Sequence, residues 1–167
     1  LAEDDWPDGA IGVLPVSGTR ASRIAADPRV RGITFTGSDA VGWPLKAANP
    51  RKKVTLELGG NAAVLVEPDA DVELAAERLT FGAFAYAGQV CISTQRILVA
   101  RDAADAFVEA FVEHARRLRA GDPLEETTDM PPMISSGEVA RVAAWVKEAC
   151  SGGAAVLVGG DGYGRFH

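Results

Sequence analysis

The sequence predicts an α/β fold built around a largely parallel sheet. Short apolar runs rich in β-branched residues alternate with longer segments of helical period, and Gly, Pro, Asp or Asn bounds each apolar run. This alternation is typical of β-α units that pack helices against a parallel sheet. The 167 residues, 47% of them hydrophobic, are enough to bury a core.

The apolar runs and the helical periodicity place the expected elements. Strands are expected over residues 10–16, 31–37, 53–58, 62–67, 95–100 and 154–159. Helices are expected over 20–26, 38–48, 71–87, 103–119 and 137–150, with starts near Asp71 and near Ser136 or Gly137. The helix over 103–119 carries an amphipathic stripe that predicts core packing, formed by Ala106, Phe107, Ala110, Phe111, His114 and Leu118.

Charge and composition argue against several classes of partner. The net charge of -6 disfavours binding to nucleic acid or to an anionic membrane. No apolar run approaches the roughly 18 to 20 residues that span a bilayer, and the acidic start "LAEDDWPDG" lacks the features of an export signal. Two cysteines without CxxC spacing suit a reducing cytoplasm, and neither the cysteines nor the two histidines are paired locally as metal ligands usually are.

The segment "FTGSDAVG", from Phe35 to Gly42, joins a predicted strand to a predicted helix. Ser38 is placed to cap that helix, so its first N–H groups could bind a phosphate. The same Gly-Ser pair is also common structural punctuation, and the spacing is not a G-x-G-x-x-G fingerprint. Pro44 should kink or shorten the helix. The local sequence leaves both interpretations open.

In "LELGGNAA", Glu57 lies within an apolar strand and precedes two glycines. A carboxylate there would be partly removed from water, an environment that suits a general base at neutral pH. Strand alternation equally allows Val54, Leu56 and Leu58 to face the core while Glu57 faces solvent. The local pattern does not separate these two hypotheses.

Cys91, in "FAYAGQVCIS", follows an apolar helical pattern. A catalytic thiol needs a base or a cation to become a thiolate, and neither histidine is well placed: His114 belongs to an amphipathic helix and His167 is the last residue. Taken alone, the local chemistry therefore favours a buried, structural role for Cys91, and the same interpretation applies to Cys150.

Together these segments resemble the aldehyde dehydrogenase superfamily. Gly37-Ser38, Glu57 and Cys91 follow the family's order, and Cys91 stands 34 positions after Glu57 (91 − 57). The phrases "DPRVRGITFTGSDAVG", "KVTLELGGNAAVLVEPDADVE", "FGAFAYAGQVCISTQRILV" and "GDPLEETTDMPPMIS" carry the resemblance across most of the chain.

The resemblance implies a role for each of these residues. Cys91 would be the nucleophile that forms a thiohemiacetal and then a thioester, its backbone N–H would be an oxyanion donor, and Glu57 would activate the hydrolytic water. NAD or NADP would be the cofactor and a small aldehyde the substrate. The cofactor contacts implied by the motif are Thr36, Gly37, Ser38, Val41, Leu58 and Gly59.

The resemblance also implies an organisation. Residues 1–58 would end a Rossmann-like nucleotide-binding domain, and 59–167 would begin an α/β catalytic domain. A dimer or tetramer is expected for the complete protein. Glu57 favours hydrolysis over CoA acylation, the alternative enzyme class, and a non-catalytic scaffold is the other alternative. The chain lacks the family's upstream Asn and Lys and its downstream Glu-Phe-Gly-Pro, so we expect the isolated 167-residue polypeptide to be inactive.

Overall fold

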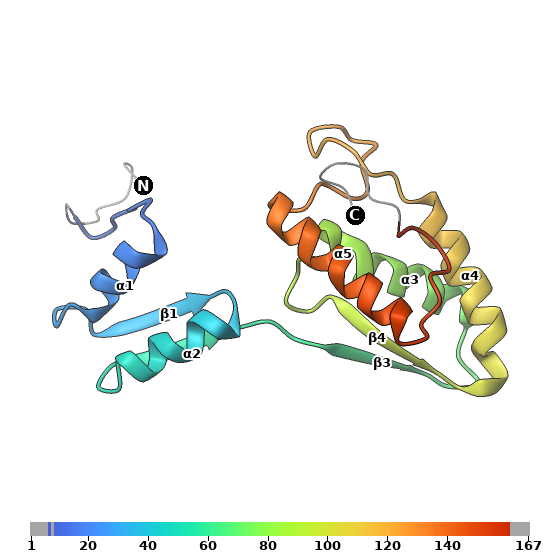
Figure 1. Cartoon of the computed structure of the whole chain (residues 1–167), viewed down its shortest axis with the longest axis horizontal. Helices are drawn as coiled ribbons and strands as arrows, with labels where there is room; N and C mark the ends of the chain where they lie inside the picture. The colour runs from blue at the N-terminus through green and yellow to red at the C-terminus, as the bar shows by residue number, and fades with distance from the viewer. Residues whose placement is uncertain (1–6, 8, 161–167) are drawn as a thin grey trace. The chain divides into compact units, whose positions relative to one another are not determined.

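The computed structural model describes residue 7 and residues 9–160, and its chain divides into two compact units, Leu1–Gly59 and Gly60–His167. Within each unit two strands pair in parallel and helices precede, connect or follow them (Figure 1). The α/β class and the parallel pairing predicted from the alternating pattern are therefore confirmed.

The first unit contains a β-α-β motif. Its elements are α1 (Gly18–Ala26), β1 (Gly32–Thr36), α2 (Asp39–Ala48) and β2 (Lys53–Glu57). The parallel register runs from Gly32 opposite Lys53 to Thr36 opposite Glu57, so the carboxyl ends of both strands lie at one edge.

Helix α2 packs closely on these strands at Gly42, which is buried. A Cβ at this position would lie 2.6 Å from Leu58 Cδ2 and 3.3 Å from Phe35 Cδ1, so any larger residue would displace the Leu58 side chain. The helix continues through Pro44 to Ala48, so Pro44 does not shorten it.

A second set of contacts joins the end of α1 to the segment before β2. The Lys52 ammonium donates to the carbonyl oxygens of Ala25 and Asp27, which satisfies acceptors at the end of the helix. The Arg29 side chain and backbone N–H donate to the Asp27 carboxylate and hold the pKa of that carboxyl well below its usual range.

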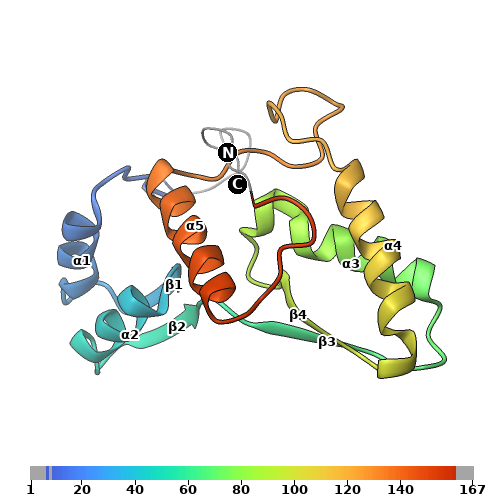
Figure 2. The same cartoon turned by 45° about the vertical axis from the view of Figure 1, so that its right-hand side comes forward.

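The second unit begins with another β-α-β motif. Its elements are β3 (Ala62–Val66), α3 (Val72–Phe84), η1 (Ala85–Gly88), β4 (Thr94–Val99), η2 (Arg101–Ala103), α4 (Ala104–Arg117) and α5 (Ser136–Ser151). Helices α3 and α4 pack against each other on one side of the β3–β4 pair in both ribbon views (Figure 2).

Buried apolar residues from three elements form the core of this unit. Val66 of β3, Ala76 of α3 and Phe107 of α4 are at most 4% exposed. Phe107 stacks on Phe111 with ring centroids 5.6 Å apart, so the amphipathic stripe predicted for this helix does pack in the core.

Side chains cap two helices of the second unit. The Asp71 carboxylate accepts a hydrogen bond from the Leu74 N–H at 3.1 Å and begins α3. The Ser135 hydroxyl oxygen accepts one from the Glu138 N–H at 3.3 Å and begins α5. The predicted starts near residues 71 and 136 are therefore correct.

Two predicted strands are wrong. The structure shows no strand over 10–16 or 154–159, and Val13 and Leu157 in these segments are 87% and 55% exposed. A strand forms only where a neighbouring strand takes up its backbone hydrogen bonds, and within residues 9–160 each sheet has two strands. No helix among the described residues has the length and apolar character needed to cross a membrane.

Candidate active site

Cys91 lies on a tight turn between η1 and β4. The turn runs from Val90 to Ser93 and is closed by a hydrogen bond from the Ser93 N–H to the Val90 carbonyl at 3.0 Å. Cys91 is exposed, so the interpretation of this residue as a buried structural cysteine is wrong. The turn directs the chain so that the thiol is open to reagents.

The backbone just before this turn is strained. Tyr86 and Ala87 have φ values of 53° and 57°, and Gly88 follows with φ 71°. A non-glycine residue in this left-handed region costs roughly 1 to 2 kcal/mol. Such strain persists only where surrounding contacts fix the backbone, and it is concentrated at functional sites. The predicted helix over 71–87 ends instead at Phe84 because of this reversal.

Two polar side chains fix the backbone around the thiol. Ser93, 5% exposed, donates its hydroxyl to the Ala83 carbonyl at 3.1 Å. The Gln89 carboxamide donates to the Tyr86 carbonyl and accepts from the Ile134 N–H, each at 3.0 Å. Gln89 and Ser93 each stand two residues from Cys91, but their residue types alone do not indicate these contacts.

The first residue of the second unit also approaches the cysteine turn. A Cβ at Gly60 would lie 3.0 Å from the Cys91 carbonyl oxygen, closer than side chains normally allow. The absence of a side chain at Gly60 therefore lets the backbone after "LELG" pass against the Cys91 peptide.

Glu57 is the last residue of β2 and is exposed. Val54, Leu56 and Leu58 are half-buried while Lys53, Thr55 and Glu57 are exposed, so the strand alternates as one of the two hypotheses predicted. The partial burial expected for the Glu57 carboxylate is not present, because this side chain lies on the outer face of the strand.

The predicted cofactor residues of the β1–α2 turn lie together at the carboxyl end of the β1–β2 pair. Thr36 is opposite Glu57 in the register, and the Gly37 N–H donates to the Glu57 carbonyl at 3.1 Å. Ser38 precedes α2, but its side chain makes no capping hydrogen bond. In the first turn of α2 the Ala40 N–H donates to the Asp39 carboxylate at 2.8 Å.

This turn fits a nucleotide in three respects. The carboxyl edge of a parallel pair is where α/β folds bind ligands. Ser38 keeps its hydroxyl exposed at a helix start, where the helix dipole favours phosphate. Val41, 53% exposed on the first turn of α2, offers an apolar surface beside it.

The two remaining predicted cofactor residues lie just beyond β2. Leu58 is half-buried, and its side chain occupies the space left open by Gly42. Gly59 is exposed, and a Cβ there would meet nothing within 4 Å, so packing within the described chain does not require glycine at this position. A close approach of the Gly59 backbone to a bound ligand would give a separate reason for glycine here.

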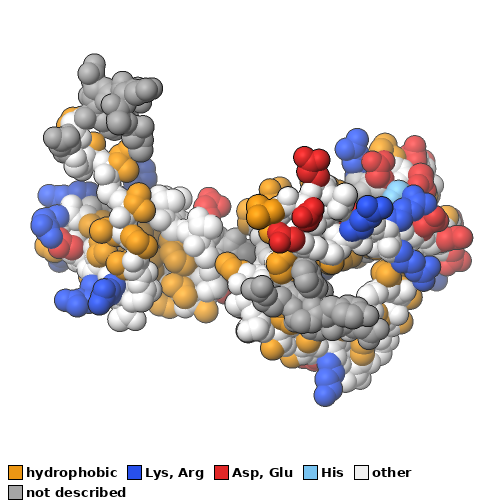
Figure 3. Space-filling view, turned by 90° about the horizontal axis from the view of Figure 1, so that it is seen from above, with side chains coloured by type: hydrophobic (Ala, Val, Ile, Leu, Met, Phe, Trp, Pro, Cys, Tyr) orange, Lys and Arg blue, Asp and Glu red, His pale blue; other side chains and the backbone are white. Residues whose placement is uncertain are grey.

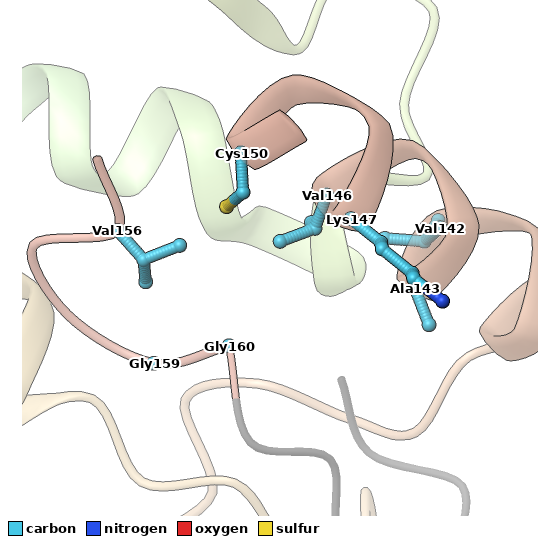
Figure 4. A pocket seen from close by; sticks show the side chains of 8 residues that line it. All are labelled: Val142, Ala143, Val146, Lys147, Cys150, Val156, Gly159 and Gly160. Atoms are coloured by element: carbon cyan, nitrogen blue, oxygen red, sulfur yellow. The ribbon is translucent and has the colours of Figure 1, made fainter. Parts of the chain in front are cut away.

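Cys150 is exposed near the end of α5, so the burial expected for this cysteine is not present. It belongs to a mainly apolar pocket of about 370 Å³ that contains none of the predicted site residues (Figure 4). The pocket is lined by Val142, Ala143, Val146, Lys147, Cys150, Val156, Gly159 and Gly160. Among the described residues, no group of three or more His, Cys, Asp or Glu could hold a metal ion.

The chain is thus an α/β protein with parallel strands and an exposed cysteine on a turn fixed by hydrogen bonds. Comparison with protein families matches residues 1–166 to the Aldehyde dehydrogenase family. The chain therefore belongs to the aldehyde dehydrogenase family.

Individual relatives agree with this family. The chain is 40% identical over its full length to 3-sulfolactaldehyde dehydrogenase of Priestia aryabhattai and 39% identical to benzaldehyde dehydrogenase [NAD(+)] of Pseudomonas putida. Each match covers 100% of this chain and 35% of the relative. The chain thus spans about a third of the length of the curated relatives it matches.

A solved structure matches the fold as well. The glyceraldehyde-3-phosphate dehydrogenase of Methanocaldococcus jannaschii, complexed with NADP, superposes with a TM-score of 0.85 at 40% identity. The match covers 87% of this chain and 32% of that one.

Proposed function

We propose that the protein carrying this chain oxidises an aldehyde to a carboxylic acid with NAD or NADP, using Cys91 as its nucleophile. The observation that carries the proposal is the exposed Cys91 on a turn held from both sides, in a chain that belongs to the aldehyde dehydrogenase family. A thiol that must attack a carbonyl carbon needs both access and a fixed direction.

Cys91 carries the first half of the reaction. Its thiolate sulfur bonds to the aldehyde carbon and gives a thiohemiacetal oxyanion, to which the Cys91 backbone N–H donates. When bound, the oxidised nicotinamide would accept a hydride (one proton with two electrons) from that carbon. The carbonyl re-forms, and Cys91 then holds the acid as a thioester.

Glu57 carries the second half. Its carboxylate takes a proton from a water molecule, whose oxygen attacks the thioester carbon. The carbon–sulfur bond breaks, the acid leaves, and Cys91 regains its thiolate. In the sequence Glu57 stands three residues before Gly60, whose backbone passes against the Cys91 peptide.

The cofactor would be held by Thr36, Gly37, Ser38 and Val41, with Leu58 and Gly59 towards its nicotinamide end. The support is the shared carboxyl edge of β1 and β2 and the uncapped Ser38 hydroxyl at the start of α2. Relatives described as binding NAD and NADP make both nucleotides candidates.

The organisation of the protein forms part of the same proposal. Residues 1–58 contribute to the nucleotide-binding domain and 59–167 to the catalytic domain. The complete protein forms a dimer or tetramer, acts in the cytoplasm on a small aldehyde, and binds neither membrane nor nucleic acid. The net charge of -6 in this chain disfavours anionic partners, and its two cysteines without CxxC spacing suit the cytoplasm.

Replacing the cysteine tests the proposal. In the protein expressed from the complete reading frame, Cys91→Ala should lower aldehyde-dependent formation of reduced nicotinamide by at least about 1000-fold, because the covalent route is lost. The matched control, Cys150→Ala, should retain the activity of the unsubstituted enzyme. Equal activity in the two variants would refute the nucleophilic role of Cys91.

A further inference from the structure

We propose that Gln89 is the positioning residue for the Cys91 thiol, and that its carboxamide ties the cysteine turn to the segment that leads into α5. The inference rests on the proposed function, because the position of the thiol matters only if Cys91 attacks the substrate. It assigns to Gln89 a role separate from that of the cysteine.

The first contact of Gln89 is with the strained backbone. The carbonyl oxygen of Tyr86 accepts two hydrogen bonds from this one residue, from the backbone N–H at 3.2 Å and from the side-chain Nε2 at 3.0 Å. Both bonds close over Ala87 and Gly88, which have positive φ. The side chain of Gln89 therefore stabilises the left-handed turn that redirects the chain from α3 towards Cys91.

The second contact reaches 45 residues along the chain. The Oε1 atom of Gln89 accepts from the Ile134 N–H at 3.0 Å. Ile134 stands between Met133, which is 8% exposed, and Ser135, which caps α5. Burial of Met133 and the cap formed by Ser135 hold the backbone on both sides of the Ile134 N–H.

These two contacts require both ends of a carboxamide. One end donates to Tyr86 and the other accepts from Ile134, which a carboxylate or a thioether of similar length does not do. Gln89 is exposed, so water can replace either bond when the side chain is changed. Since Cys91 is only two residues further on, loss of the carboxamide leaves the cysteine turn held by the Ser93 side chain and by the backbone bonds of Gln89 and Ser93.

Substitutions of Gln89 in the complete protein separate these effects. Gln89→Met keeps the side-chain length and removes both bonds, whereas Gln89→Glu keeps the acceptor for Ile134 and loses the donor to Tyr86. We expect Gln89→Met to lower kcat by about 10- to 100-fold, the scale of loss for a small displacement of a reacting group. The KM for the nucleotide should stay unchanged, and Gln89→Glu should fall between Gln89→Met and the unsubstituted protein.

The reaction of Cys91 with iodoacetamide, followed by peptide mass, provides a readout that needs no turnover. Gln89→Met should slow this alkylation and leave that of Cys150 unchanged. The matched control is Gln95→Met, which changes the chain's other glutamine, an exposed residue on β4. Thermal melting measured in parallel shows whether Gln89→Met folds. If it does not, the kcat and the alkylation rate of Gln89→Glu test the inference in its place.

The outcomes separate the inference from the proposed function. Turnover that depends on Cys91 but is the same in Gln89→Met, with unchanged alkylation of Cys91, overturns the role of Gln89 alone. Turnover that persists in Cys91→Ala would instead contradict the proposed function. Equal losses of kcat in Gln89→Met and Gln95→Met would show a general effect of surface substitution and would also overturn the inference.

Discussion

Cys91 and Glu57 are both exposed in the described chain, but their surroundings differ. Cys91 lies on a turn fixed through Ser93 and Gln89. Glu57 lies at the end of a strand, with its backbone held by Gly37 and its side chain directed outward. Under the proposed function the fixed turn would orient the Cys91 thiol, whereas the exposed Glu57 carboxylate lacks the partial burial expected for a general base.

Glu57→Gln should separate the two halves of the reaction. The amide cannot take a proton from water, so hydrolysis of the thioester should slow by about 100- to 10000-fold, while the first turnover still forms reduced nicotinamide. Rapid-mixing absorbance measurements should show a burst of about one equivalent per Cys91. Glu67→Gln, which changes the exposed glutamate after β3, is the control. A variant that loses the burst as well as the steady rate would contradict a role confined to hydrolysis.

The roles that the family phrases imply for Cys91 and Glu57 stay predictions. Strand alternation left two placements of Glu57 open, and the structure shows the one that puts it on the face opposite Leu56. Local chemistry wrongly predicted that Cys91 is buried, because a turn that exposes it depends on positive φ at Tyr86 and Ala87. Neither residue type favours that conformation, so no sequence signal was available.

At the scale of elements, close packing of α2 on its strands positions the predicted cofactor turn. Gly42 lets the helix approach Phe35 and Leu58, and the start of α2 then lies beside the carboxyl ends of β1 and β2. The geometry of this turn therefore depends on a single small residue in the helix.

Gly42→Ala should destabilise the protein by about 1 to 3 kcal/mol, the usual cost of overpacking, because the new methyl group would overlap Leu58. Gly12→Ala provides the control, since a Cβ at Gly12 meets nothing within 4 Å. Urea denaturation of the complete protein measures both variants. Equal urea midpoints for Gly42→Ala and Gly12→Ala would contradict the packing assigned to α2.

Helices were more predictable than strands. Periodicity and capping residues such as Asp71 report on the helix itself, so the five predicted helices were found with shifts at their ends. Strand formation depends on a partner elsewhere in the chain. The apolar runs at 10–16 and 154–159 therefore have strand composition but no strand.

At the scale of the whole molecule, much apolar surface is exposed in both units (Figure 3). Leu65 and Leu98 are neighbours in the β3–β4 register and are 68% and 50% exposed. Parallel sheets are normally covered on both faces. The relatives matched by this chain are about three times as long, at 35% coverage, so they contain further chain that could cover such a face.

The 167-residue polypeptide expressed alone should therefore associate and lack activity. Size-exclusion chromatography should show species larger than a 17.5 kDa monomer, increasing with concentration, because exposed apolar faces pair with one another. Aldehyde-dependent formation of reduced nicotinamide should be absent. A monomer with a turnover on the order of 1 to 1000 per second would contradict both expectations.

The most direct test of the central claim is the mass of the acyl group trapped on the enzyme. Glu57→Gln protein from the complete reading frame, mixed with an aldehyde and oxidised nicotinamide and then quenched in acid, should carry an acyl thioester on the peptide that contains Cys91. An adduct on the peptide of Cys150, or no adduct while reduced nicotinamide accumulates, would contradict the assignment of Cys91 as the nucleophile.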